Sequence, residues 1–226
     1  MKVEIREVAT PHGPGRLHVT KAPRPVATLL LGHGAGGGVE APDLVALATH
    51  LPRSGITVMR YEQPWRVAGR KVAPAPAVLD VCLTAAVRTL RIRTPLLLGG
   101  RSAGARSACR LSAGLGAGLG AGPVPVGVLA LSFPLHPPGK PEKSRLDELT
   151  AVEVPVLVVQ GERDPFGGPQ EFPEDTELTV VPGGDHSFRV PKRVGLTAEE
   201  TMSIIVEAVL EWVASRTVSP TRGSGS

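Results

Sequence analysis

Residues 95–104 read Pro-Leu-Leu-Leu-Gly-Gly-Arg-Ser-Ala-Gly, and this stretch decides the fold. Its apolar first half predicts a buried strand over 95–99, and residues 103–113 predict a helix directly after it. Ser102 therefore falls at a strand-to-helix turn, with Gly100 two positions before it and Gly104 two positions after it. A turn this tight leaves no room for side chains at those two positions. It also lifts the serine hydroxyl clear of the backbone, at the positive end of a helix. The pattern is typical of a nucleophile elbow.

Outward from this stretch, apolar runs alternate with amphipathic segments along the whole chain. Such alternation is typical of an α/β fold with a mostly parallel sheet of seven or eight strands and helices on both faces. The predicted strands are 3–8, 17–19, 27–32, 56–60, 95–99, 126–131, 154–160 and 178–181. The predicted helices are 42–51, 76–90, 103–113 and 198–213.

The chain length of 226 residues suits one domain, which we expect to span residues 1–214. The glycine-rich stretch 114–122 predicts a flexible surface loop. Residues 215–226 are polar and predict a disordered tail. No apolar run approaches the roughly 20 residues of a membrane span, and the charged N-terminus is unlike a signal peptide. Cys82 and Cys109 fall in predicted helices, which favours buried thiols and a cytoplasmic location.

The charge is unevenly distributed, although the net charge is only +4. Residues 81–141 contain no acid, whereas residues 142–211 contain 15 acids against 6 Lys and Arg. We favour solvated helix faces over a basic surface beside Ser102 as the explanation. The basic residues form no run and are not interleaved with aromatics, so the sequence does not predict nucleic-acid binding.

A nucleophilic serine needs a base, and His186 is the candidate. It lies in the small-residue loop 182–188, between the last predicted strand and the closing helix. A neutral imidazole there can accept the serine proton and return it to a leaving group. His136, in a proline-rich loop, is a distant rival.

The base needs a carboxylate to orient it, and Asp164 is the candidate because it follows the strand 154–160. Glu162 and Asp147 are rivals that could also reach the histidine. Asp185 is bonded in sequence to His186, which makes the required geometry unfavourable.

An oxyanion needs backbone N–H donors, and the glycine-rich stretch 33–38 follows the buried strand 27–32. Its glycines let the main chain approach a ligand closely. The amides of Ala35 and Ala103 are the natural pair of donors. The order along the chain is then glycine-rich turn, Ser102, Asp164 and His186, each after a different strand.

From about residue 27 to residue 213 the sequence resembles the α/β-hydrolase superfamily. Within it, the sequence is similar to the small, capless, dienelactone-hydrolase-like group, which includes a subunit of a eukaryotic histone-acetyltransferase complex. The stretches 32–36 (GHGAG), 99–104 (GGRSAG), 133–142 (FPLHPPGKPE) and 160–164 (QGERD) carry this resemblance. The resemblance implies an α/β-hydrolase fold and the Ser-Asp-His triad. Dienelactone hydrolases proper use a cysteine nucleophile where this chain has Ser102, so their substrate class is not carried over.

Aromatic residues are scarce, and most of the seven follow predicted strand ends. Together they predict an apolar pocket beside Ser102. Its predicted residues are His33, Tyr61, Trp65, Phe133, Phe166 and Phe188. The only segment that could form a cap, 134–149, is short and proline-rich, so an open site is expected.

These features predict a serine hydrolase that cleaves a small ester or thioester through an acyl-enzyme. No cofactor is expected, and the Cys and His spacings predict no metal site. The expected partner is a small acyl substrate, with no nucleic acid or membrane. The alternative is a non-enzymatic interaction module on the same fold, since fold does not fix function.

Overall fold

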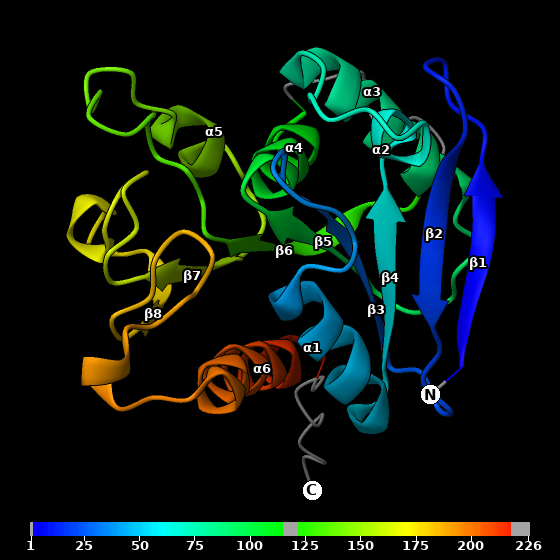
Figure 1. Ribbon diagram of the computed structural model, residues 1–226. Helices are drawn as coiled ribbons and strands as arrows, with labels where there is room; N and C mark the ends of the chain where they lie inside the picture. The colour runs from blue at the N-terminus through cyan, green and yellow to red at the C-terminus, as the bar shows by residue number, and fades with distance from the viewer. Residues whose placement is uncertain (1, 115–121, 218–226) are drawn as a thin grey trace, which may run out of the picture.

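One eight-stranded sheet forms the centre of the computed structural model, which describes residues 2–114 and 122–217 (Figure 1). The strands lie in the order β1-β2-β4-β3-β5-β6-β7-β8. β2 is antiparallel to β1 and to β4, and the pairings from β4 through β3 to β8 are parallel. The bounds are β1 Val3–Val8, β2 Gly15–Thr20, β3 Ala27–Gly32, β4 Ile56–Glu62, β5 Leu96–Arg101, β6 Pro125–Leu131, β7 Val156–Gly161 and β8 Glu177–Val181. All eight predicted strands are confirmed to within two residues.

Helices cover both faces of the sheet, as the alternating pattern predicts. α1 and α6 lie on one face, and α3 and α4 lie on the other (Figure 1). The bounds are α1 Pro42–His50, α2 Pro64–Val67, α3 Pro76–Thr89, α4 Ala103–Ser112, α5 Leu146–Thr150 and α6 Ala198–Thr217. Residues 215–217, predicted as tail, belong instead to α6. The rest of that predicted tail, and most of the predicted loop 114–122, lie outside the described residues.

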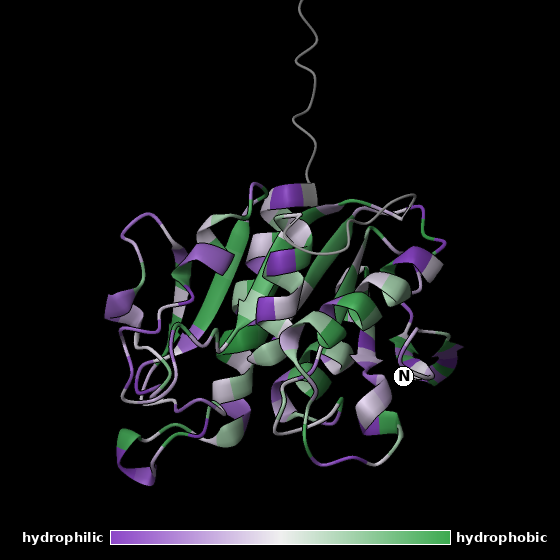
Figure 2. Ribbon diagram, turned by 90° about the horizontal axis from the view of Figure 1, so that it is seen from above, coloured by the Kyte–Doolittle hydropathy of each residue, from purple (hydrophilic) through white to green (hydrophobic). Residues whose placement is uncertain are grey.

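The core consists of two apolar clusters, one on each face of the sheet. β3 shows the principle, because Leu30 points into one cluster while Leu29 and Leu31 point into the other. The central strands are accordingly apolar along their length, whereas the helices carry polar residues on their outer sides (Figure 2). Cys82 and Cys109 are free and buried, as predicted. Within the described ranges, no helix is both long enough and apolar enough to span a membrane.

A buried charge network holds α3, α4 and α5 together. Asp80 of α3 accepts hydrogen bonds from Ser107 Oγ at 2.6 Å and from Arg110 Nη2 at 2.7 Å, both on α4. Arg110 also donates to Glu148 of α5 at 2.8 Å, and Arg106 donates to the same carboxylate at 2.8 Å. These two arginines belong to the acid-free stretch, so part of its charge is neutralised inside the protein.

We predict that Asp80→Ala lowers the free energy of unfolding by about 3 kcal/mol, because Arg110 then loses a bidentate carboxylate partner in a desolvated position. Urea unfolding followed by circular dichroism measures the change. The control is Glu4→Ala, which removes an exposed partner of Arg6 and Lys21 and should leave stability nearly unchanged. Equal losses in the two variants would contradict the prediction.

Candidate active site

Ser102 sits on a strained turn between β5 and α4. Its φ of 53° and ψ of −114° lie in a region that residues with side chains rarely adopt. Its N–H donates to the carbonyl of Leu131, the last residue of the neighbouring strand β6, at 2.9 Å. The turn is therefore held by the sheet itself, and the serine side chain is only partly buried.

Glycines around the turn allow three backbone segments to meet. A Cβ atom added to Gly100 would lie 2.6 Å from the carbonyl oxygen of Gly32 and 2.7 Å from the carbonyl carbon of Gly104. A Cβ atom on Gly104 would collide with the same Gly32 carbonyl. The end of β3, the end of β5 and the start of α4 are thus in direct backbone contact. Positions 100 and 104 therefore have no room for a side chain, as the sequence pattern around Ser102 predicts.

His186 is within hydrogen-bond distance of both other members of the predicted triad. Ser102 Oγ lies 2.9 Å from His186 Nε2, and Asp164 Oδ2 lies 2.8 Å from His186 Nδ1. Because the carboxylate accepts from Nδ1–H, Nε2 is the nitrogen free to accept the serine proton. The structure therefore brings the three residues together in the order that a proton relay needs.

Asp164 is held rigidly from its other side. Its side chain is fully buried. Oδ1 accepts the backbone N–H of Phe166 at 2.8 Å, and Oδ2 also accepts from Gln160 Nε2 at 3.1 Å. Gln160 has no exposed surface and donates further to the Gly167 carbonyl at 2.8 Å. The carboxylate oxygens are therefore fixed by a side chain of β7 and by the loop that follows this strand.

The loops after β7 and β8 are joined by backbone contacts, which is how Asp164 reaches His186. Arg163 N–H donates to the carbonyl of Gly184 at 2.8 Å. A Cβ atom on Gly161 would lie 2.5 Å from that same oxygen, so only glycine allows the loops to come this close.

The rival acids and the rival base are engaged or placed elsewhere. Glu162 accepts the backbone N–H of Gly183, and Asp185 accepts the N–H groups of Ser187 and Arg189 within its own loop. Asp147 is exposed on α5. His136 bonds Glu171 and the Pro137 carbonyl.

The glycine-rich loop after β3 lies against the serine. A Cβ atom on Gly34 would be 3.4 Å from Ser102 Cβ. His33 orients this loop, because its Nε2 accepts the Gln63 N–H at 3.1 Å and its Nδ1–H donates to the Gly34 carbonyl at 2.9 Å. Burial lowers the pKa of His33, which keeps the ring neutral in this role. Since the Gly34 carbonyl is held by His33, the Ala35 N–H of the same planar peptide points the opposite way.

Three of the predicted pocket residues are core residues instead. Tyr61 and Phe133 have no exposed surface, and Phe188 is 2% exposed. Tyr61 O–H donates to the Cys82 carbonyl at 3.0 Å, on the side of the sheet that α3 covers. Phe188 has a φ of 55° and packs in the cluster under α1 and α6. The prediction that Tyr61 and Phe133 line a pocket beside Ser102 is wrong, because the order along the chain does not say which way a side chain faces. Phe188 lines a hollow of about 250 Å³ with Pro42 and Met202, and Ser102 is not part of that lining.

The other predicted pocket residues lie near the triad or near its loops. Phe166 packs against the His186 ring, with ring centroids 4.2 Å apart. Trp65 is 6% exposed and meets the ring of His33 edge-on, with centroids 5.6 Å apart. Phe166 is thus the predicted pocket residue that touches His186. Trp65 instead packs against His33, the residue that orients the glycine-rich loop.

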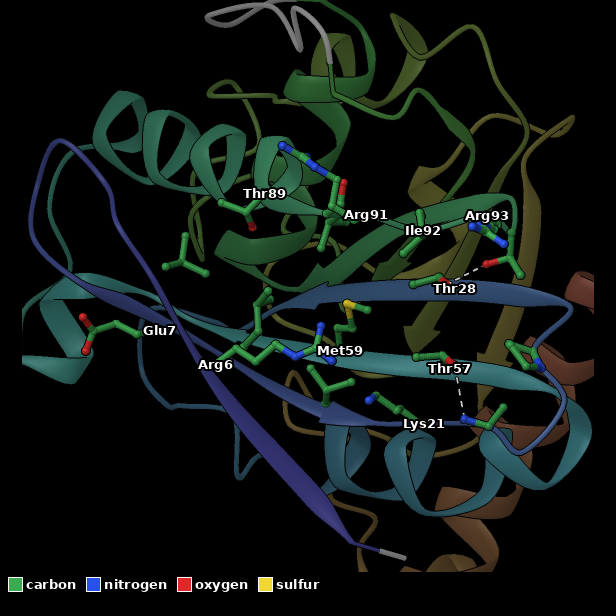
Figure 3. Close-up of a pocket in the computed structure, with 17 residues that line it drawn as sticks. Arg6, Glu7, Lys21, Thr28, Thr57, Met59, Thr89, Arg91, Ile92 and Arg93 are labelled. Carbon is green, nitrogen blue, oxygen red and sulfur yellow. Dashed lines mark hydrogen bonds between the residues drawn. The ribbon is translucent and has the colours of Figure 1, made fainter.

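Two cavities lie away from the triad. One of about 520 Å³ is lined by Trp65, Gln63 and part of the segment 68–74. Another of about 490 Å³ lies where β3 and β4 begin, between Thr28, Thr57 and the segment 89–94 (Figure 3). Ser102 follows the end of β5, so this second cavity is at the opposite edge of the parallel strands. Within residues 2–114 and 122–217, no group of three His, Cys, Asp or Glu side chains is arranged to hold a metal ion.

Arg101, Asp43 and Gln160 are polar residues of the site that the sequence analysis did not single out. Arg101 Nη2 donates to the His186 carbonyl at 2.6 Å, and Arg101 Nε lies 3.2 Å from Asp43 Oδ2. The position of Arg101 directly before the serine was the one available signal.

The comparisons with known proteins agree with this fold. A family described as an alpha/beta hydrolase domain matches residues 25–214, and the chain belongs to that family. A serine hydrolase without a lid from Xanthomonas campestris is 22% identical, with a TM-score of 0.70 over 94% of this chain and 95% of that one. A dienelactone hydrolase from Anabaena variabilis is 15% identical, with a TM-score of 0.69 over 95% and 97%. Est1E from Butyrivibrio proteoclasticus is 15% identical, with a TM-score of 0.67 over 93% and 99%.

We predict that Gly104→Ala lowers the free energy of unfolding by about 3 kcal/mol or more, because the added methyl group meets backbone atoms that cannot move aside. Gly37→Ala is the matched control, since a Cβ atom there has nothing within 4 Å. Thermal unfolding of both variants measures the difference. A Gly104→Ala protein as stable as Gly37→Ala would show that the three segments are less closely packed than described.

Proposed function

We propose that the protein is a serine hydrolase that cleaves small carboxylic esters or thioesters through an acyl-enzyme. The observation that carries the proposal is the double contact of His186, 2.9 Å from Ser102 Oγ and 2.8 Å from Asp164 Oδ2. A surface histidine without a catalytic role has no reason to bridge a strained serine and a buried carboxylate. The family and the similar serine hydrolase without a lid support hydrolysis as the reaction class.

The reaction follows from this geometry. Ser102 Oγ attacks the carbonyl carbon while its proton passes to His186 Nε2, and Asp164 stabilises the imidazolium that forms. The tetrahedral oxyanion is held by the N–H groups of Ala35 and Ala103, in our proposal. Its collapse breaks the bond to the alcohol or thiol, which takes the proton from His186. A water molecule then attacks the acyl-enzyme by the same relay and releases the acid.

We infer a small substrate from the residues that surround the serine. Tyr61, Phe133 and Phe188, which would have walled a deep acyl pocket, are buried in the core. The end of the segment 134–149 is fixed to α4 through Glu148, which does not favour a lid over the serine. Phe166 beside His186 then offers apolar contact for a short acyl group. A cytoplasmic location remains part of the proposal.

The first test is labelling with a fluorophosphonate probe, together with turnover of p-nitrophenyl acetate, butyrate and decanoate. We expect the wild type to be labelled, Ser102→Ala to lose the label, and acetate and butyrate to be cleaved faster than decanoate. The resemblance to a capless group with a member in a histone-acetyltransferase complex keeps an interaction module as the alternative. A folded wild type that takes no label would favour that alternative.

The orienting role of Asp164 gives a second prediction. Asp164→Asn should lower kcat by about 10⁴, because an amide favours the wrong imidazole tautomer while leaving the fold intact. Asp147→Asn is the matched control, since that rival carboxylate is exposed on α5 and should be silent. Steady-state kinetics with p-nitrophenyl acetate compares the two. If the two variants lost activity equally, Asp164 would not be the orienter.

A further inference from the structure

The guanidinium of Arg101 lies where three segments of the site meet. Nη2 donates to the His186 carbonyl at 2.6 Å, and Nε lies 3.2 Å from Asp43 Oδ2 on α1. A Cβ atom on Gly34 would be 3.7 Å from Nη1. The side chain is 12% exposed. One largely buried cation therefore contacts the histidine loop and the first turn of α1, and it lies beside the glycine-rich loop.

The bond to His186 concerns its backbone, not its ring. The backbone bonds of that loop run between Asp185 and Arg189 and between Phe188 and Asp185. The donor that the structure gives to the His186 carbonyl is Arg101. Since Arg101 is bonded in sequence to Ser102, this contact ties the peptide of the base to the peptide of the nucleophile. Asp164 fixes the ring, and Arg101 fixes the chain that carries it.

Asp43 explains how a cation is tolerated there. Its side chain is 2% exposed and makes an ion pair with Arg101 rather than a well-aligned hydrogen bond. Burial raises the pKa of Asp43, while Arg101 and the backbone N–H groups of Leu44 and Asp43 act to lower it. An unpaired Arg101 would disfavour the imidazolium that His186 must form, so the carboxylate also serves the base.

We propose that Arg101 is a positioning residue that fixes the His186 backbone relative to Ser102, with Asp43 as its buried counter-ion. This inference rests on the hydrolase function proposed above. The hydrogen bond from Arg101 to the His186 carbonyl sets the position of His186 relative to Ser102 and does not involve the substrate. Its loss should therefore lower kcat rather than weaken substrate binding. Misplacement by about 1 Å at a catalytic group costs on the order of 100-fold in rate.

The test compares Arg101→Gln and Arg101→Lys with Arg106→Gln, whose arginine is also in an ion pair near the elbow but bonds Glu148 rather than the histidine loop. We expect Arg101→Gln to lower kcat for p-nitrophenyl acetate by roughly 10- to 100-fold, with KM changed less than about twofold. Lysine keeps the charge and one donor, so it should recover part of the loss. Arg106→Gln should lower stability without changing kcat.

A second variant distinguishes a loss of positioning from a failure to fold. Arg101→Gln combined with Asp43→Asn removes both buried charges, and it should fold while keeping the defect in kcat. Asp43→Asn alone should move the acid limb of the kcat/KM profile to lower pH, because Arg101 is then an uncompensated cation. The charged groups that face His186 are Asp164, Arg101 and Asp43, with Asp185 and Arg189 in its own loop.

A spectroscopic signal separates this proposal from the proposed function. The low-field proton resonance of the hydrogen bond from His186 Nδ1 to Asp164 reports the position of the base without any turnover. Its loss in Arg101→Gln and its retention in Arg106→Gln would support positioning even if the wild type took no fluorophosphonate label. An unchanged resonance together with wild-type kcat in Arg101→Gln would overturn the proposal, as would equal losses of kcat in Arg101→Gln and Arg106→Gln.

Discussion

The close approach of three backbone segments at Gly32, Gly100 and Gly104 is the constraint on which the rest of the site depends. It presses the start of α4 against the end of β3, and no side chain larger than hydrogen fits between them. The connection between β5 and α4 must then turn within one residue, which leaves Ser102 with a positive φ. Strain of this kind costs about 1–3 kcal/mol and persists only where the surroundings hold it. Here the hydrogen bond from the Ser102 N–H to the Leu131 carbonyl holds it.

The strands, and the convergence of Ser102, Asp164 and His186, could be predicted because both follow from local pattern and chain order. Buried parallel strands are apolar along their length, and their carboxyl ends meet at one edge of the sheet. Ser102, Asp164 and His186 each follow such an end, so their meeting required only the topology. The short helices α2 and α5 were not predicted, since four or five residues show no helical period.

The side chains that surround Ser102 could not be predicted from the positions of the strand ends alone. A position after a strand places a residue at the right edge, but it does not say whether the side chain faces solvent or the core. Tyr61 turns inward to bond Cys82, whereas Phe166 turns outward onto His186. Arg101 and Asp43 were missed because the groups that they contact lie far away in the sequence.

The strand β1 forms one outer edge of the sheet, and such an edge offers unpaired N–H and C=O groups to any neighbouring chain. Its exposed residues alternate apolar and charged, with Val3 and Ile5 beside Glu4 and Arg6, and Lys21 of the next segment adds to this charge. A second molecule that paired along this edge would have to strip water from these charges. The edge therefore works against sheet-to-sheet aggregation, and it does so at the side of the molecule most distant in sheet order from the loops of Asp164 and His186.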